Sequence, residues 1–294
     1  MTLTAPPRLL LVHAHPDDES LSTGGTIARY ASRGVQVTVV TCTLGEQGEI
    51  IPASLAELRA EAADQLGGYR VGELRSACAA LGVTDHRFLG GMGRWRDSGM
   101  VGDPAGAHPR AFVRGDPAEQ AGQLAEIIAA VRPQVVVTYD AHGGYGHPDH
   151  IRAHEITMRA VTEPGPPGGH RVDRVFHAVH SGRALAAGVA VLAELPELPF
   201  TLPADGELAA VDDEIITTTV DVRAHLPAKL RALRAHTTQL TVWENGDARA
   251  FALTNGIAQP VLPAEYYVLA VGPAEGAGPD LFGGLGLVGL EDEE

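Results

Sequence analysis

The chain has 294 residues, enough for one large domain with a well-formed core. Its formal net charge of −15, with Lys229 as the only lysine, disfavours binding to a nucleic-acid backbone. No apolar stretch reaches roughly 18 residues, and the N-terminus lacks a signal-peptide pattern. Cys42 and Cys78 are read as reduced thiols. We therefore expect a cytoplasmic protein with no nucleic-acid or membrane partner, and its oligomeric state stays open.

The first 182 residues alternate predicted strands with predicted helices. Apolar runs predict strands over 8–14, 35–43, 87–90, 135–139 and 174–181. Apolar residues at helical spacing predict helices over 21–33, 55–66, 71–81, 117–131 and 147–161. Gly34 ends the first helix, and Gly67-Gly68 separates the second from the third. This alternation predicts an α/β fold, with a Rossmann-like, mostly parallel sheet and helices on both faces.

Irregular stretches and a less regular C-terminal part complete the prediction. Residues 91–116 and 141–146 are long loops of the kind that often bind ligands. After residue 182, a Pro-rich connector over 196–203 precedes strands over 215–222 and 266–271 and a helix over 225–236. We predict a catalytic domain over 1–182 and a smaller, mixed α/β part over 183–294 that caps the pocket without folding independently. The acidic tail, 291–294, is expected to be solvated.

The most informative motif is His15-Pro16-Asp17-Asp18-Glu19, directly after the first predicted strand. Open α/β sheets bind ligands at the carboxyl ends of their strands. An imidazole and a carboxylate three residues apart can bind one divalent metal, most naturally zinc. The remaining carboxylate could then act as a base on water. The simpler alternative is that His15 and Asp18 only cap the following helix, because Asp is a favoured N-cap residue.

A second motif, Tyr145-Gly146-His147-Pro148-Asp149-His150, follows the predicted strand 135–139. A catalytic zinc usually takes three protein ligands and keeps one position open, so this motif can supply the third. Spacing alone allows His147 with His150, or His150 with His154, because all three share one helix face. Asp149 could hold the ring of His147 and raise its basicity.

Together, these two motifs resemble those of the LmbE/PIG-L family of zinc-dependent N-deacetylases. The resemblance implies His15, Asp18 and His150 as the zinc ligands. It also implies Asp17 as the general base, although a carboxylate that only orients His15 is the alternative. His147 becomes the general acid or oxyanion partner, and Tyr145 a hydrogen-bond donor to the oxyanion. One zinc ion per chain is expected, although Fe²⁺ can occupy similar ligands.

Longer segments are similar to the branch of this family that acts in mycothiol biosynthesis. They are residues 39–46, 64–70 and 93–100. The resemblance implies hydrolysis of the acetamide of N-acetylglucosaminyl-inositol, an amino-sugar inositol, to glucosaminyl-inositol and acetate. Arg70, Asp97 and Glu46 are the expected sugar contacts, and His13 is expected beside the site.

Other functions remain as alternatives at this point. A mycothiol S-conjugate amidase shares the metal loop, but that group typically has a lysine soon after Asp-Asp-Glu, where this chain has Ser20-Leu21-Ser22-Thr23. A deacetylase of another N-acetyl sugar would use the same residues. A two-metal phosphoesterase would need more ligands than the one set found here. A sugar-binding protein with a structural metal would need neither Asp17 nor an unligated His147.

Overall fold

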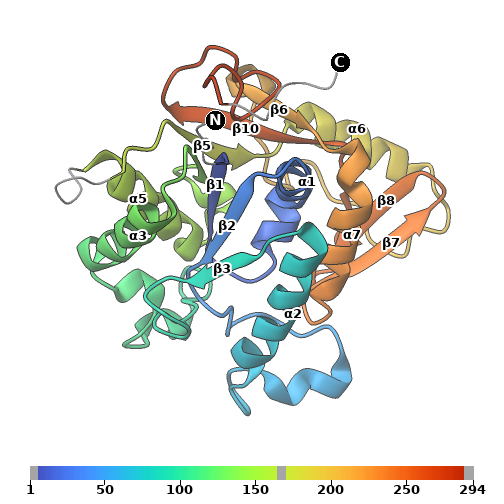
Figure 1. The fold of residues 1–294 in the computed structure, drawn as a ribbon. Helices are drawn as coiled ribbons and strands as arrows, with labels where there is room; N and C mark the ends of the chain where they lie inside the picture. Colours follow the sequence, from blue (N-terminus) through green and yellow to red (C-terminus); the bar gives the residue numbers. More distant parts are fainter. Residues whose placement is uncertain (1–5, 164–169, 288–294) are drawn as a thin grey trace.

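A seven-stranded sheet forms the centre of the molecule (Figure 1). The structure, a computed structural model, describes residues 6–163 and 170–287, so the predicted solvated tail lies outside the described residues. The strands are β1 (Arg8–His13), β2 (Gln36–Thr41), β3 (Asp85–Phe88), β4 (Val135–Tyr139), β5 (Arg174–Val179), β6 (Thr218–Asp221) and β10 (Ala264–Val271). Their order is β3-β2-β1-β4-β5-β10-β6. The first five are parallel, and β10 runs antiparallel to both β5 and β6.

Helices cover both faces of the sheet, because the buried side chains of β1 alternate between them. Leu9 and Leu11 pack in one core with α1 (Asp18–Ser32), α2 (Leu66–Leu81) and α7 (Leu226–Ala235). Leu10 and Val12 pack in a second core with α3 (Pro117–Val131) and α5 (Pro148–Thr162). Alternate residues of a strand point to opposite faces, so a strand buried on both sides is apolar throughout. The predicted Rossmann-like fold is confirmed.

The chain after residue 182 contributes to the main sheet and also forms a small one. It contains α6 (Gly182–Ala193), and strands β6 and β10 extend the main sheet beyond β5. A separate antiparallel sheet has the order β7-β8-β9, formed by β7 (Thr241–Asn245), β8 (Ala248–Ala252) and β9 (Gln259–Pro260). The sequence did not predict α6 or this sheet. The division into 1–182 and 183–294 stays a prediction.

The predicted helices over 55–66 and 71–81 are wrong in their bounds. Residues Ala53–Leu58 form a short 3₁₀ helix with no buried residue, so no apolar face stabilises a longer helix there. Helix α2 begins at Leu66 and includes both glycines that were expected to separate two helices. A Cβ on Gly67 would lie 2.7 Å from Cγ of Glu46, so the glycine allows α2 to approach that loop. Other 3₁₀ helices are Pro104–Ala107, Phe112–Arg114, Asp213–Ile215 and Arg223–His225.

The two sequence motifs meet where the order of the sheet reverses. Strands β1 and β4 are neighbours, and the chain leaves them toward opposite sides of the sheet. Helix α1 begins inside the first motif, at Asp18, three residues earlier than predicted. The second motif contains the single turn α4 (Gly143–Gly146) and the start of α5. Within the part of the chain that the structure describes, no helix is long and apolar enough to cross a membrane.

Candidate metal centre

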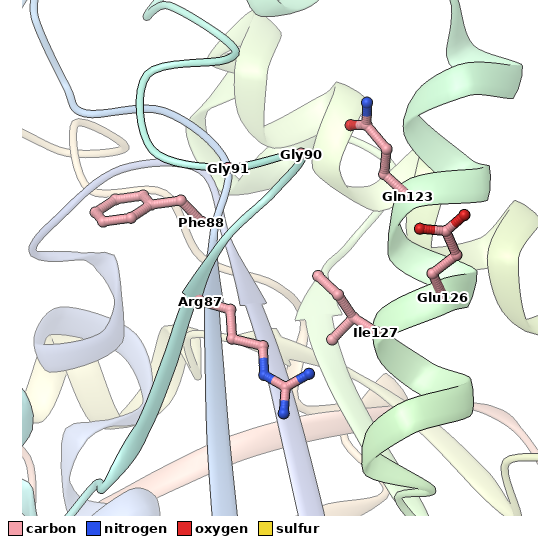
Figure 2. Close-up of a pocket in the computed structure, with 7 residues that line it drawn as sticks. All are labelled: Arg87, Phe88, Gly90, Gly91, Gln123, Glu126 and Ile127. Carbon is pink, nitrogen blue, oxygen red and sulfur yellow. The ribbon is translucent and has the colours of Figure 1, made fainter.

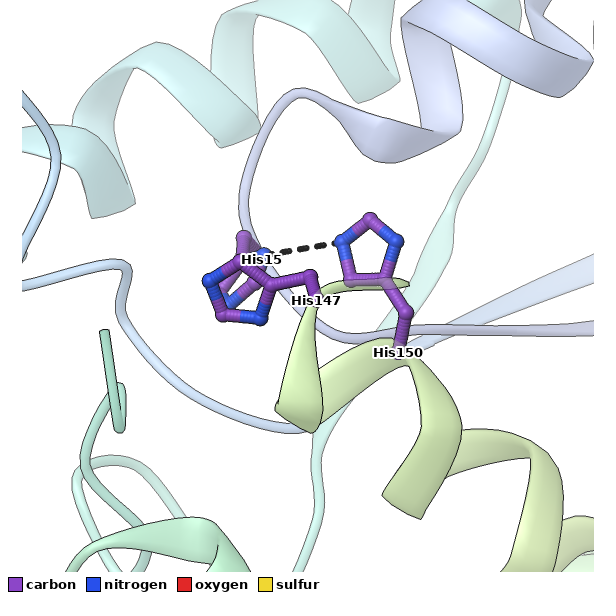
Figure 3. A group of neighbouring side chains, drawn as sticks. All are labelled: His15, His147 and His150. Atoms are coloured by element: carbon purple, nitrogen blue, oxygen red, sulfur yellow. Dashed lines mark hydrogen bonds between the residues drawn. The ribbon is translucent and has the colours of Figure 1, made fainter. Parts of the chain in front are cut away.

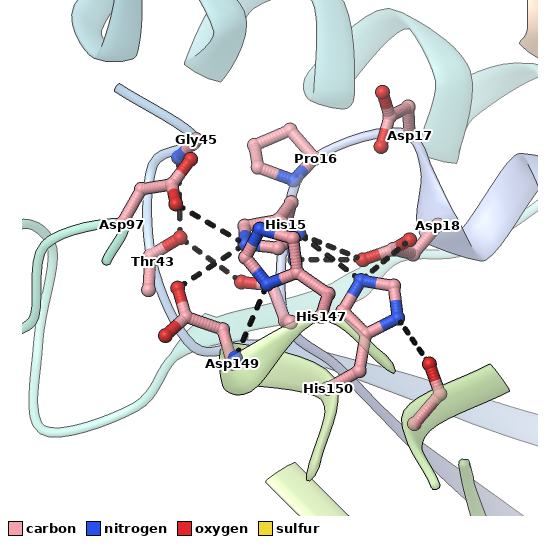
Figure 4. Close-up of polar contacts among 12 residues, drawn as sticks. His15, Pro16, Asp17, Asp18, Thr43, Gly45, Asp97, His147, Asp149 and His150 are labelled. Atoms are coloured by element: carbon pink, nitrogen blue, oxygen red, sulfur yellow. Dashed lines mark hydrogen bonds and ion pairs between the residues drawn. The ribbon is translucent and has the colours of Figure 1, made fainter. Parts of the chain in front are cut away.

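The three predicted metal ligands, His15, Asp18 and His150, bring their donor atoms together between β1 and α5 and are called the triad below. Nδ1 of His15 lies 3.2 Å from Nε2 of His150 (Figure 3). The Asp18 carboxylate places one oxygen 3.5 Å from Nδ1 of His15 and the other 3.5 Å from Nε2 of His150 (Figure 4). Tetrahedral ligands with bonds of about 2.0–2.1 Å stand about 3.4 Å apart. The spacing of these donors therefore fits a tetrahedral metal.

The remaining ring nitrogens of both histidines have their own partners. Nε2 of His15 lies 3.2 Å from Oδ2 of Asp149, and Nδ1 of His150 lies 3.2 Å from the carbonyl of Gly143. A metal-binding histidine usually donates its other N–H to a carboxylate or a carbonyl, which fixes the tautomer. These contacts leave Nδ1 of His15 and Nε2 of His150 as the donors toward a metal.

Tyr139, the last residue of β4, supports two members of the triad and was missed by the sequence analysis. Its hydroxyl donates to Oδ2 of Asp18 at 2.7 Å and accepts from the backbone N–H of Ala14 at 2.7 Å. Its ring stacks on His150, with centroids 4.2 Å apart and planes 20° apart. Nδ1 of His154 lies 2.9 Å from the carbonyl of Tyr139, so His154 contacts the strand end. The sequence does contain a signal for this role, because Tyr139 ends the predicted strand 135–139 shortly before the second motif.

The electrostatics of the centre favour a bound cation. Burial opposes protonation of His15, but the neighbouring Asp97 and Asp149 carboxylates outweigh it and raise its pKa well above its usual range. Burial also opposes ionisation of Asp18, but His150 and His15 hold the pKa of Asp18 well below its usual range. A surplus of ionised carboxylates around two imidazoles suits a divalent cation of the zinc type.

Asp17 lies beside the triad with an uncommon backbone conformation. Its φ of 112° and ψ of −31° lie where L-residues rarely occur, a strain of about 1–3 kcal/mol. The carboxylate is buried and pairs with Arg70 through Nη2 at 3.0 Å. Burial raises the pKa of Asp17 to about 7, even though Arg70 acts to lower it. A carboxylate with a pKa near neutrality can accept a proton at physiological pH.

His147 borders the triad and caps helix α5. Donor atoms of His15, His147 and His150 lie within 4.8 Å of one another (Figure 3). Nδ1 of His147 accepts the backbone N–H of Asp149 at 3.1 Å. Burial, together with the neighbouring histidines, lowers the pKa of His147 to about 4. In the neutral ring, the proton must therefore be on Nε2, which is available as a donor.

The Asp149 carboxylate, predicted to hold the ring of His147, forms its side-chain contact with His15 instead. Oδ2 of Asp149 pairs with Nε2 of His15 and also accepts the backbone N–H of Ser98 at 3.0 Å. The hydrogen bond between Asp149 and His147 comes from the backbone N–H of Asp149, because His147 is the N-cap of α5. The charge of the Asp149 carboxylate still acts to raise the pKa of His147. The carboxylate therefore orients a predicted metal ligand.

Tyr145 lies at the exposed edge of the centre. Its side chain is 58 % exposed, and its ring centroid lies 5.0 Å from that of His150 and 6.0 Å from that of His147. The glycines on either side have positive φ, and Gly144 breaks the helical geometry of α4 with φ 68° and ψ −88°. This turn places the phenol over the two histidines.

The predicted sugar-contact residues surround the other side of the triad, where their polar groups already have protein partners. Asp97 Oδ1 lies 3.6 Å from Nε2 of His15, and the backbone N–H of Asp97 donates to Glu46 at 3.0 Å. Arg70 is 3 % exposed and donates to the carbonyls of Gly45 and Pro16 as well as to Asp17. These contacts tie three loops together at the centre.

His13 lies beneath the site rather than at its surface. Its side chain is buried, and Nε2 lies 3.1 Å from Oγ1 of Thr23 on α1.

A separate pocket between β3 and α3 is lined by none of the predicted site residues (Figure 2). Its lining residues are Arg87, Phe88, Gly90, Gly91, Gln123, Glu126 and Ile127.

A buried residue of the first motif forms a further contact that no pattern in the sequence indicates. Glu19, the last residue of the first motif, pairs with His236 at the end of α7 at 2.8 Å. The two residues are 217 positions apart, and no local pattern in the sequence links them.

The chain is similar in sequence to a described family and to named relatives along most of its length. The model of the family described as PIG-L, GlcNAc-PI de-N-acetylase, matches residues 10–161. A 1D-myo-inositol 2-acetamido-2-deoxy-alpha-D-glucopyranoside deacetylase from Actinosynnema mirum is 73% identical over 97% of this chain and 100% of its own length. A protein of the same name, numbered 1, from Saccharopolyspora erythraea is 63% identical over 99% of this chain and 98% of its own.

Solved structures share the fold at low sequence identity. An N,N'-diacetylchitobiose deacetylase from Pyrococcus horikoshii has a TM-score of 0.52 at 20% identity, covering 78% of this chain and 69% of that one. A 4-carboxy-2-hydroxymuconate hydratase from Pseudomonas putida has a TM-score of 0.57 at 19% identity, covering 91% and 97%. Likeness at this level shows the fold alone. The sequence match and the close relatives go further: the chain belongs to the PIG-L family of de-N-acetylases.

Proposed function

We propose that the chain hydrolyses the acetamide of N-acetylglucosaminyl-inositol, releasing acetate and glucosaminyl-inositol, as a step of mycothiol biosynthesis. The observation that carries this proposal is the convergence of His15, Asp18 and His150 beside a separate buried carboxylate, Asp17. Relatives named as deacetylases of this substrate match nearly the whole chain at 73% and 63% identity, which supports the same substrate here.

His15, Asp18 and His150 would hold one zinc ion. When bound, zinc polarises the acetamide carbonyl and lowers the pKa of a coordinated water toward 7. The donor set is two imidazoles and a carboxylate, which suits zinc and also accommodates Fe²⁺. The contacts of Asp149 to His15 and of Gly143 to His150 would keep both rings in the required tautomers.

Asp17 is the general base in this proposal. Its carboxylate accepts a proton from the attacking water, and its pKa near 7 matches that task at neutral pH. The ion pair with Arg70 holds the carboxylate in place. This gives Arg70 a positioning role, in addition to the sugar contact predicted from the sequence.

His147 and Tyr145 would stabilise the negative charge that develops on the acetamide oxygen. His147 is neutral near pH 7 and carries its proton on Nε2, so it donates a hydrogen bond to this oxygen without first being protonated. As the C–N bond breaks, the departing amine takes the Nε2 proton of His147, the general acid, and the proton accepted by Asp17 replaces it over the cycle. The hydroxyl of Tyr145 is a second donor, presented from the exposed turn. Of the predicted sugar contacts, we propose that Asp97 and Glu46 bind hydroxyl groups of the substrate. His13 supports the site from below.

The first experiment measures release of free amine from N-acetylglucosaminyl-inositol and, in parallel, from a mycothiol S-conjugate and a simple N-acetyl sugar. We expect preference for the first substrate, loss of activity with a chelator and recovery with zinc. Asp17→Ala should lower kcat roughly 10²–10⁴-fold while the metal content is retained. Asp116→Ala, at the exposed N-cap of α3, is the matched control. Preference for the conjugate would contradict the substrate assignment. Near-normal turnover by Asp17→Ala would contradict the assignment of Asp17 as the base.

A further inference from the structure

Glu19 connects the backbone of Asp17 to a distant part of the chain. Oε2 of Glu19 accepts the backbone N–H of Asp17 at 3.0 Å. Oε1 accepts from Nε2 of His236 at 2.8 Å and from the hydroxyl of Ser20 at 2.6 Å. Both side chains of the Glu19–His236 pair are fully buried, so water does not compete for these bonds.

The segment that carries His236 is itself fixed to the N-terminal half. His236 follows α7, and the next residues bind Glu73 on α2. The backbone N–H and the hydroxyl of Thr238 donate to the two oxygens of Glu73 at 2.8 and 2.7 Å, and the hydroxyl of Thr237 donates at 2.8 Å. The imidazole therefore has a fixed position from which to hold Glu19.

Asp17 needs such a hold because its backbone conformation is unfavourable for an L-residue. At φ 112°, the residue relaxes toward an ordinary conformation unless its neighbours prevent it. Arg70 holds the carboxylate and the carbonyl of Pro16 on one side. The bond to Glu19 holds the N–H on the other. A change of φ would move the carboxylate relative to Asp18, which begins α1.

We propose that Glu19 and His236 are positioning residues that hold Asp17 in its strained conformation, so that the C-terminal part of the chain sets the orientation of the general base. The role of Asp17 as a base belongs to the proposed function, on which this inference rests. The hold on the backbone itself is independent of that role and can be measured separately.

The test compares His236→Phe, His236→Gln and Glu19→Met with the control Lys229→Met. Phe fills the site without a donor, whereas the amide of Gln can replace the Nε2–H bond to Glu19. Lys229 pairs with the buried Glu265 at 2.6 Å, and Glu265 accepts backbone N–H groups of Gly25 and Thr26 on α1. Lys229→Met therefore removes a buried cation from α7, the helix that His236 follows, at a position away from Asp17.

Two readouts are needed. The first is the hydrogen exchange and chemical shift of the Asp17 amide in ¹⁵N-labelled, metal-free protein. The second is kcat and KM of the zinc-loaded enzyme. We expect His236→Phe to speed exchange of the Asp17 amide at least tenfold and to lower kcat at least tenfold, with KM within twofold. His236→Gln should restore most of both. Glu19→Met, which keeps a side chain of similar length without any acceptor oxygen, should resemble His236→Phe and serves if that variant does not fold.

An unchanged Asp17 amide in both His236→Phe and Glu19→Met would overturn the inference. Equal losses in Lys229→Met would also overturn it, because the cause would then be general loosening of the C-terminal part. If the wild type has no deacetylase activity, the proposed function fails, and the amide measurement alone decides whether the pair holds Asp17.

Discussion

At the scale of the residue, Tyr139 contacts two of the proposed metal ligands, one through its hydroxyl and the other through its ring. It donates to Asp18, accepts from the backbone of Ala14, and stacks its ring on His150. We expect Tyr139→Phe to keep the stacking and lose both hydrogen bonds, so that zinc affinity falls about 10–100-fold, the range typical for such supporting contacts. Competition with a chromophoric chelator measures this affinity directly.

Tyr267→Phe is the control for Tyr139→Phe. Tyr267 is also buried, and its hydroxyl bonds to Thr26 at 2.7 Å instead of to the triad. Loss of its hydroxyl should lower stability without changing zinc affinity. If both variants bind zinc as the wild type does, Tyr139 does not orient Asp18 in the way we describe.

The sequence predicted the residues that lie at the centre, but it did not predict the side chains that hold them in place. His15, Asp18 and His150 follow the ends of two strands that the pattern identified, so their proximity follows from the fold. The partner of the Asp149 carboxylate depends on side-chain direction at a helix N-terminus, which spacing does not determine. The contact of His236 with Glu19 depends on how α7 packs, which no local pattern reports. The roles assigned to these residues remain predictions.

At the scale of the element, helix α1 fits against the C-terminal part through a glycine. A Cβ on Gly25 would lie 2.5–2.8 Å from the side chain of Val222, which is fully buried after β6. We expect Gly25→Ala to lower the free energy of unfolding by about 1–3 kcal/mol, the cost typical of overpacking. Urea denaturation of the metal-free protein measures this change.

Gly72→Ala on α2 is the matched variant with the opposite expected sign. Nothing lies within 4 Å of a Cβ built there, and the residue is exposed inside a helix. Alanine should therefore stabilise the protein by about 0.5–1 kcal/mol through the lower conformational entropy of the unfolded chain. If Gly25→Ala were equally stabilising, the close contact between α1 and Val222 would be wrong.

Elements with a strong pattern were predicted well, and elements defined by tertiary contacts were not. Strand β4 and helix α3 match their predicted bounds, because an apolar run and an Asp-Pro start define them locally. Helix α6 is rich in alanine and buries only Leu185 and Leu192. Its sequence therefore shows no clear alternation of apolar and polar residues at helical spacing. Strand β9 has two residues and forms only by pairing with β8.

At the scale of the whole molecule, Arg174 joins the main sheet to the last described part of the chain. This residue begins β5, its side chain is fully buried, and its guanidinium donates to four backbone carbonyls at 2.6–3.0 Å. They belong to Pro273, Glu275, Leu281 and Gly283. Tyr30 on α1 binds the same segment through Asp280 at 2.9 Å. The segment after β10 is therefore held from both the sheet and a helix.

Replacing Arg174 with methionine should release this segment before the rest of the fold. Methionine fills much of the space but donates no hydrogen bonds, which leaves four carbonyls without their partner, and each buried unsatisfied group costs about 1–3 kcal/mol. Because the segment can reach water by detaching, we expect the loss in the free energy of unfolding to stop at about 2–4 kcal/mol. Limited proteolysis should then cleave within residues 273–287 while the circular dichroism of the sheet stays native.

Arg223→Met, at an exposed ion pair with Asp221, should change stability by less than about 1 kcal/mol and leave this segment protected. Cleavage at the same rate in both variants would show that the segment is not held by Arg174.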